Sequence, residues 1–435
     1  MAAITAIPQT PVKARKLRHA WQRSLLTFLM VAGPGLIVME ADNDAGAVST
    51  YVQAGAQYGT HLLWLLLLLL PVTYFTQEMV ARLGIATGQG HAAMIYARFG
   101  KWWGRFSLAD LLIVNFLTLV TEFAAIALAV REAGAAPWAA VPVAAAGLLA
   151  LVLSGGYLRW ERITIFLCLL DVAWIVMAAR THPHWATVAR HALAPSLPAG
   201  GLSGNVVLLM IAIVGTTIAP WQLFFQQSCV AEKRLRFSDL KWERLDTLVG
   251  ACFTVIVAGC MMIVGDLAYR HHLAFSDPAQ LAAALVPFAG EGLRTLILLL
   301  MVNASVLGAT AISLSSAWAY GEVKRWPHSL HRKIREAPGF YAVYCGGVIA
   351  AAGIVLIPKL PLQLVIVGVQ VLAGLMLPSA IIFLQLLLND RELLGEHLAN
   401  RRWNNWVNWS IVFVLFALSL VLAAQVAAPG WFARL

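Results

Sequence analysis

Eleven apolar windows, each long enough to cross a bilayer, restrict the fold of this 435-residue sequence more than any other feature. A transmembrane helix needs about 20 mostly apolar residues, and windows of this length satisfy their backbone polar groups in lipid as helices. We therefore predict an all-α polytopic membrane protein. The windows cover residues 24–58, 60–81, 107–130, 138–156, 162–180, 203–230, 246–269, 291–320, 339–357, 362–388 and 406–427.

Charge is sparse and confined to particular segments of the chain. Only 12% of the residues are charged and 60% are hydrophobic, whereas a globular domain carries about 25% charged residues. The net charge of +10 would suit nucleic acid, but most Lys and Arg residues lie in short segments between the windows, a pattern that sets membrane topology. We expect the protein to lie in the inner (plasma) membrane and to have no nucleic-acid partner. Residues 1–23 form a basic arm, which we expect to lie in the cytoplasm.

The first window carries three carboxylates and an amide near its middle, at Glu40, Asp42, Asn43 and Asp44. Ionised groups at this depth are costly and usually functional. Gly46, flanked by alanines, favours a break in the helix that would expose backbone carbonyl oxygens beside the acids. The combination predicts a cation site. A soluble core helix with a capping Asp is the alternative, which the surrounding apolar windows oppose.

The sixth window is interrupted in the same way, because Gly215 and Pro220 weaken its helix. The two interrupted windows are five spans apart, and an odd number of spans reverses polarity. We therefore predict a first five-helix repeat at 24–180 and an inverted second repeat at 203–388, followed by a linker and an eleventh helix at 389–435. Chance placement of the proline is the alternative.

Four stretches resemble the Nramp family of divalent-metal transporters. They are the first window from Gly33 to Gly59, the RLGIATG segment at 82–88, the GTTIAPWQLFFQQS segment at 215–228 and the segment 370–403. The resemblance implies a LeuT-like fold with helices 1 and 6 broken. It also implies a site in which Asp44 anchors the ion. We place the other metal-site positions at Ala41, Asp42, Asn43, Thr216, Ala219 and Gln370, and the pathway positions at Glu122, Ala47 and Trp221. Asp42 and Asn43 are absent from the family pattern, and we expect them to hold the outer hydration shell of the ion.

Two departures from the family pattern concern the transported ion. Ala47 stands where the family has an Asn ligand, and Ala219 stands where it has a Met. A thioether is a soft ligand that suits transition metals, whereas a wider, oxygen-lined cavity suits Mg²⁺, which keeps several waters. The sequence thus resembles the divergent magnesium-transporting branch, and we expect uptake of Mg²⁺ and also Mn²⁺.

Further departures concern protons. Leu119 replaces the third-span Asp of the family's proton route, and Trp221 and Gln226 replace its two histidines. Because His is the side chain best suited to exchange protons near neutral pH, we expect transport without proton coupling. A proton-coupled Mn²⁺/Fe²⁺ transporter is the alternative. An amino-acid carrier of the same fold is less favoured, because acids at the break oppose a substrate carboxylate.

The remaining polar residues suggest no other chemistry. Enzyme motifs such as HExxH or GxSxG are absent from the sequence, so we expect no enzymatic activity, no cofactor beyond the transported ion, and a monomer. We expect Glu78, Asp171 and Asp266 to be solvated at span ends. His182, His184 and His191 fall in the segment 181–202, which we predict to be a loop.

Overall fold

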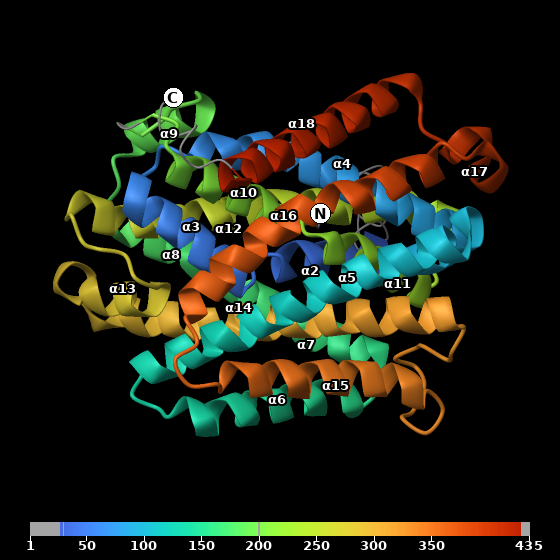
Figure 1. Ribbon diagram of the computed structural model, residues 1–435, viewed down its shortest axis with the longest axis horizontal. Coiled ribbons are helices and arrows are strands. Elements are labelled where there is room, and N and C mark those ends of the chain that lie inside the picture. The colour runs from blue at the N-terminus through green and yellow to red at the C-terminus, as the bar shows by residue number, and fades with distance from the viewer. Residues whose placement is uncertain (1–26, 29, 199–200, 428–435) are drawn as a thin grey trace, which may run out of the picture.

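The computed structural model describes residues 27–28, 30–198 and 201–427, and these residues form helices and connecting loops without a strand. The prediction of an all-α fold is therefore confirmed, whereas the basic arm at 1–23 lies outside the described residues. Figure 1 shows the helices packed side by side in one bundle, with α6 and α15 along one side and α18 along the opposite side. The helices are α2 (Pro34–Ala41), α3 (Ala45–Tyr58), α4 (Leu63–Thr87), α5 (His91–Glu132), α6 (Pro137–Leu153), α7 (Tyr157–Leu170), α8 (Val172–Arg180), α9 (Trp185–Leu193), α10 (Gly204–Thr217), α11 (Pro220–Glu232), α12 (Leu240–Arg270), α13 (Pro278–Ala284), α14 (Val286–Lys324), α15 (Pro338–Val355), α16 (Leu362–Leu388), α17 (Arg391–Leu398) and α18 (Arg402–Ala427).

Helices occupy most of the described residues of every predicted window. Among the described residues, eight helical segments are long and apolar enough to cross a membrane. The other three windows hold the broken pair α2 and α3, the 17-residue apolar helix α6, and the 26-residue helix α18. The chain is thus a multi-pass membrane protein.

The first and sixth spans are interrupted at their centres, as predicted. Residues 42–44 separate α2 from α3, and residues 218–219 separate α10 from α11. Half-helix α2 packs against α11, and α3 packs against α10. The first half of one broken span therefore meets the second half of the other, which is the antiparallel relationship expected of inverted repeats.

A left-handed glycine occurs shortly before both the third and the eighth span. Gly100 in α5 has φ 84° and Gly290 in α14 has φ 81°. Residues other than glycine rarely adopt these angles, so each helix is kinked sharply at this point. The third and eighth spans hold corresponding positions in the two predicted repeats, and they share this feature.

Several predicted boundaries and environments were wrong. Helix α12 begins at Leu240 rather than at 246, and the segment 181–202 contains helix α9. Glu78, Asp171 and Asp266 are buried instead of solvated. Glu78 and Asp266 are neutralised by arginines, since Glu78 Oε1 lies 2.7 Å from Arg244 Nη2, and Asp266 Oδ2 lies 3.0 Å from Arg270 Nε. Asp171 lies at a break between α7 and α8.

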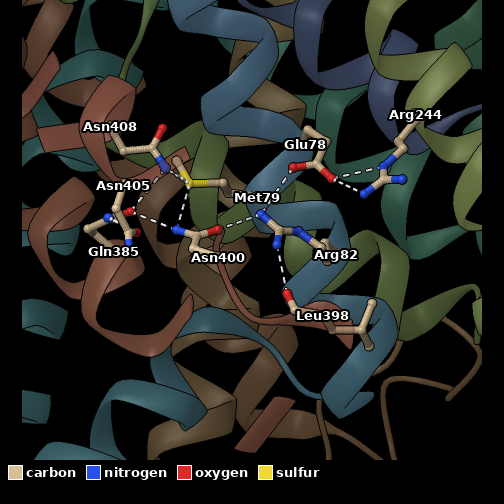
Figure 2. A network of polar contacts seen from close by, with 9 residues as sticks. All are labelled: Glu78, Met79, Arg82, Arg244, Gln385, Leu398, Asn400, Asn405 and Asn408. Carbon is tan, nitrogen blue, oxygen red and sulfur yellow. Dashed lines mark hydrogen bonds and ion pairs between the residues drawn. The ribbon is translucent and has the colours of Figure 1, made fainter. Parts of the chain in front are cut away.

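A buried polar network ties the C-terminal helices to α4 (Figure 2). Arg82 on α4 pairs with Glu78 at 3.3 Å and donates hydrogen bonds to the Leu398 carbonyl at 2.7 Å and to Asn400 Oδ1 at 2.8 Å. Because removing one partner of a buried ion pair typically costs about 3–5 kcal/mol, this network fixes the linker before α18. It continues through Gln385, Asn405, Asn408 and Met79.

Candidate metal-binding site

The break in the first span brings carboxylates to the centre of the bundle. Asp42 is 1% exposed and Asp44 is 3% exposed, so both acids are removed from solvent. Asp44 is the N-cap of α3, and its Oδ1 accepts a hydrogen bond of 2.9 Å from the Ala47 backbone N–H. An Asp is favoured at this position because its carboxylate satisfies an unpaired amide at the helix start. The cap fixes the carboxylate beside the unwound segment.

Glu122 on α5 holds the same break open. Its Oε2 accepts a hydrogen bond of 3.1 Å from the Ala45 N–H, the amide that would bond to the Ala41 carbonyl in a continuous helix. The Ala41 carbonyl is thereby left without its helical donor. Gly308 on α14 makes room for both acids, because a Cβ added there would lie 2.8 Å from Asp44 Cβ and 2.9 Å from Glu122 Cδ.

The break in the sixth span supplies further oxygens. Pro220 begins α11 and has no N–H, so the Thr216 carbonyl lacks the donor that a continuous helix would give it. Thr216 is buried, and its Oγ1 has no hydrogen-bond partner among the described residues. Thr217 accepts a hydrogen bond of 2.7 Å from Tyr51 on α3 and donates one of 2.6 Å to the Ile213 carbonyl. The polar end of α10 therefore meets the middle of α3.

Gln222 joins the two breaks directly. Its Nε2 donates a hydrogen bond to Asp42 Oδ1, and its Oε1 accepts one of 2.9 Å from Gln77 Nε2 on α4. The second oxygen of Asp42 has no partner among the described residues. The Asp42 carboxylate is therefore held by one amide and retains a free oxygen.

Gln370 on α16 closes another side of the site. It is buried, its Nε2 has no partner within the described chain, and a Cβ on Gly46 would collide with that nitrogen. Glycine at position 46 thus lets the amide approach the first turn of α3. A buried, unpaired amide is suited to hydrogen bonding with a water molecule carried by an ion.

The available donors are predominantly oxygens from acids and unwound backbone. Within the described ranges, no group of three or more His, Cys, Asp or Glu side chains has a metal-holding arrangement. A cation here would therefore be held by the two aspartates together with neutral oxygens and water. Hard cations prefer such oxygens, whereas thiolates, thioethers and imidazoles favour transition metals.

Comparison with known proteins agrees with this geometry. The model of the family "Nramp: Natural resistance-associated macrophage protein-like" matches residues 35–425. The chain belongs to this family. It is 29% identical to the "Divalent metal cation transporter MntH" of Ralstonia nicotianae, with 98% of this chain and 99% of that protein covered. It is 26% identical to the protein of the same name from Verminephrobacter eiseniae, with 89% and 88% covered.

Solved structures share the fold. The crystal structure of an Eremococcus coleocola manganese transporter matches with a TM-score of 0.77 at 19% identity, covering 97% of this chain and 90% of that one. MhsT in complex with L-phenylalanine matches with a TM-score of 0.54 at 14% identity, covering 90% and 98%. The predicted LeuT-like fold is confirmed. Because the Nramp family is a family of transporters, the expectation that the chain is not an enzyme is confirmed as well.

The site positions predicted from the sequence do not all converge. Asn43 Nδ2 donates to the Thr254 carbonyl of α12 at 3.4 Å, so its amide lies on the opposite side of the unwound segment from Asp42 and Gln222. Trp221 is fully buried and packs edge-on against Phe225, with ring centroids 5.9 Å apart. Its side chain belongs to an aromatic cluster. Ala47 and Ala219 are buried at the starts of α3 and α11.

Sequence reasoning missed several polar residues of this site. Gln77, Gln222 and Tyr51 are uncharged, and none of them lies in the acidic stretch at 40–44. A polar amide inside an apolar window was the available signal. His91 was also missed: it is buried at the start of α5, and its Nδ1 lies 2.9 Å from Gln227 Oε1 of α11. A histidine therefore contacts the sixth span, although none lies within it.

The end of the bundle where α2 begins is closed by charged groups. Asp246 Oδ2 accepts hydrogen bonds from the Gly33, Gly35 and Leu36 amides at 3.1, 2.8 and 3.2 Å. Lys233 Nζ lies 2.8 Å from Glu161 Oε1 and donates to the Ala32 carbonyl at 2.8 Å. Together these contacts hold the N-terminus of α2 against α7, α11 and α12.

Proposed function

We propose that this protein is a divalent metal cation transporter of the plasma membrane. The observation that carries the proposal is the convergence of Asp42 and Asp44, both buried, on the crossing of two unwound segments. Relatives of the same length are named divalent metal cation transporters. The half-helix ends and unwound carbonyls of such folds are suited to cations. An amino-acid carrier is disfavoured, because two buried acids would repel a substrate carboxylate.

The proposal extends to the ion, which we take to be Mg²⁺, with Mn²⁺ also carried. Ala47 and Ala219 place methyl groups where the family pattern has an amide and a thioether. The remaining donors are oxygens, which favour an ion that keeps part of its water shell. The divergent magnesium-transporting branch is accordingly the part of the family that this chain resembles.

The proposed transport runs without coupled protons. Leu119 is apolar, and Gln226 donates to Glu243 Oε1 at 3.1 Å and to Thr247 at 3.0 Å, so neither residue can exchange a proton. A divalent ion gains about 4.6 kcal/mol at −100 mV, which suffices to drive uptake. A proton-coupled Mn²⁺/Fe²⁺ transporter is the second candidate, because Glu122 lies beside Asp44 and His91 contacts the sixth span.

The topology forms part of the same proposal. We place the N-terminal arm at 1–23 in the cytoplasm, the first repeat at 24–180, the inverted repeat at 203–388, and the linker and eleventh span at 389–435. The end of α2 closed by Asp246 then faces the cytoplasm. We propose that the monomer is the transporting unit, because each site lies within one chain.

The test of the site is Mg²⁺ binding and flux in the Asp44→Ala variant. Calorimetry on purified protein should show loss of the Asp44-dependent binding event, and proteoliposomes should lose Mg²⁺ uptake. Asp110→Asn is the matched control, because Asp110 is a spanning-helix acid that accepts from Ser379 on α16, away from the breaks. Unchanged binding and flux in Asp44→Ala, with folding intact, would refute the assignment.

Proton coupling is tested separately with a pH-sensitive dye inside proteoliposomes. An inward Mg²⁺ gradient at clamped potential should produce metal flux without acidification. Proton flux that scales with Mg²⁺ flux and disappears in Asp44→Ala would support the second candidate instead.

A further inference from the structure

A second group of buried polar side chains lies on the other side of the first-span break. Glu40, the next-to-last residue of α2, is fully buried and accepts a hydrogen bond of 3.0 Å from Thr254 Oγ1 on α12. The Asn43 amide donates to the carbonyl of the same residue, Thr254, at 3.4 Å. Glu40 and Asn43 therefore face α12, whereas Asp42 faces Gln222 on α11.

Asp171 lies at the break between α7, which packs against α2, and α8, which packs against α12. Glu40 lies where α2 contacts α12. Asp171 is fully buried. Asp171 Oδ1 accepts a hydrogen bond of 3.2 Å from Asn303 Nδ2 on α14. The same Asn303 nitrogen donates to the Leu167 carbonyl of α7 at 3.2 Å. The fifth and eighth spans thus meet the first span at this point.

Each of these four side chains retains an oxygen without a donor. Glu40 Oε2, Asp171 Oδ2, Asn43 Oδ1 and Asn303 Oδ1 are all buried, and none has a hydrogen-bond partner within the described part of the chain. No ion pair among the described residues involves Glu40 or Asp171, so no basic side chain of these residues compensates the charge of the two acids. Buried carboxylates and amides persist only when their oxygens are satisfied.

We propose that Glu40, Asp171, Asn43 and Asn303 form a second binding site, for a hard divalent cation, separate from the site at Asp44. Two carboxylates balance the charge of one such ion, and two amide oxygens add the neutral ligands that Mg²⁺ or Ca²⁺ accepts. A shared proton could satisfy only one carboxylate contact and would leave both amide oxygens unpaired. The donor set therefore favours a metal ion over a proton.

The second site shares one structural element with the first. Glu40 and Asn43 flank Asp42 in the unwound stretch between α2 and α3, so an ion at the second site ties the end of α2 to α7, α8 and α14. Occupancy of the second site would hold the break in the geometry that presents Asp42 and Asp44. The site does not depend on which ion is transported, nor on whether the first site binds at all.

The test is the number of Mg²⁺ ions bound by the full-length protein in detergent, measured by calorimetry. The wild type should bind two, Asp44→Ala should retain one, and Asp171→Asn should also retain one. The double variant Asp44→Ala/Asp171→Asn should bind none. Asp110→Asn again serves as the matched control, and gel filtration verifies folding. An Asp171→Asn variant that binds as many ions as the wild type would overturn the second site.

A second variant keeps the proposal testable if Asp171→Asn does not fold. Asn303→Asp adds a carboxylate without changing the size of the side chain, so it should tighten Mg²⁺ binding in the Asp44→Ala background by about tenfold or more. Unchanged affinity would contradict the site. Displacement of the remaining ion by millimolar Na⁺, or its replacement by a titrating proton, would also overturn the divalent assignment. Loss of the Asp44-dependent ion alone would bear only on the proposed transport site.

Discussion

The side-chain amide of Gln222 donates a hydrogen bond to the carboxylate of Asp42, so the two broken spans are joined at the point where each is unwound. The contact pairs an α11 residue with one from the break between α2 and α3. Because spans 1 and 6 belong to different predicted repeats, any relative movement of the repeats must accommodate this bond. We expect this bond to weaken if Asp42 turns toward a metal ion, which would link ion binding to the packing of α11.

Replacing Gln222 tests that link. Gln222→Leu leaves a buried carboxylate oxygen unpaired, and a hydrogen bond to a charged group is worth about 1.5–3 kcal/mol. We expect thermal unfolding of the metal-free protein to occur at a lower temperature and the stabilisation by Mg²⁺ to increase. Gln77→Leu is the matched control, because it removes the other partner of Gln222 and leaves the Asp42 bond. Equal Mg²⁺ stabilisation in both variants and the wild type would contradict the link.

Selectivity can be tested at Ala47 and Ala219, the two buried positions where small residues replace family ligands. Ala219→Met combined with Ala47→Asn should favour Mn²⁺ over Mg²⁺ by about tenfold, which corresponds to about 1.4 kcal/mol. Competition between the two ions in proteoliposome flux provides the measurement. Ala219→Leu is the control, since leucine has a volume similar to that of methionine but no sulfur. A tenfold Mn²⁺ preference already present in the unmodified protein would refute the hard-ion proposal.

The cap at the start of α2 offers a conformational test. Asp246→Asn removes the charge that holds three backbone amides, so the residues from 33 to 41 should exchange hydrogen faster by about tenfold or more. Asp239→Asn is the matched control. Asp239 lies just before α12, the helix that carries Asp246, and it bonds only to its neighbours Arg236 and Ser238. Hydrogen exchange followed by mass spectrometry measures both. Equal exchange in the two variants would show that the cap does not close this end.

The sequence determines the fold better than it determines the site. Apolar windows were enough to predict the spans, and Gly46, Gly215 and Pro220 were enough to predict the two interruptions, because these features act locally. The contacts of Asp171 could not be predicted, since its burial depends on α2 and α14, which are remote in sequence. Asn43 shows the same difficulty within one motif: its neighbours Asp42 and Asp44 lie toward the first site, and only the direction of the unwound backbone turns Asn43 toward α12.

The last prediction concerns pH and the end of the bundle opposite the α2 cap, where His191 on α9 stacks on His61 with ring centroids 4.3 Å apart. His191 Nδ1 also lies 2.8 Å from Thr60 Oγ1. Partial burial lowers the pKa of His191 below its ordinary value, and the charges of the nearby His61 and Arg190 lower it further. The unfolded or undocked segment therefore binds a proton at a higher pH than the docked one. The packing of α9 through His191 onto His61 is therefore unaffected above a pH of about 6.5. It weakens as the pH falls below that value toward the lowered pKa.

We expect hydrogen exchange in α9 to accelerate between pH 7.5 and pH 5 after correction for intrinsic rates, because protonation of His191 opposes its stacking on His61. His191→Phe keeps an aromatic ring at the stack and removes the titrating group, so exchange in this variant should lose most of its pH dependence. His184→Phe is the control. His184 lines a cavity of about 220 Å³ together with His61 and His191, but it takes no part in the ring stack. An equal pH response in the wild type and His191→Phe would show that His191 is not the group that titrates.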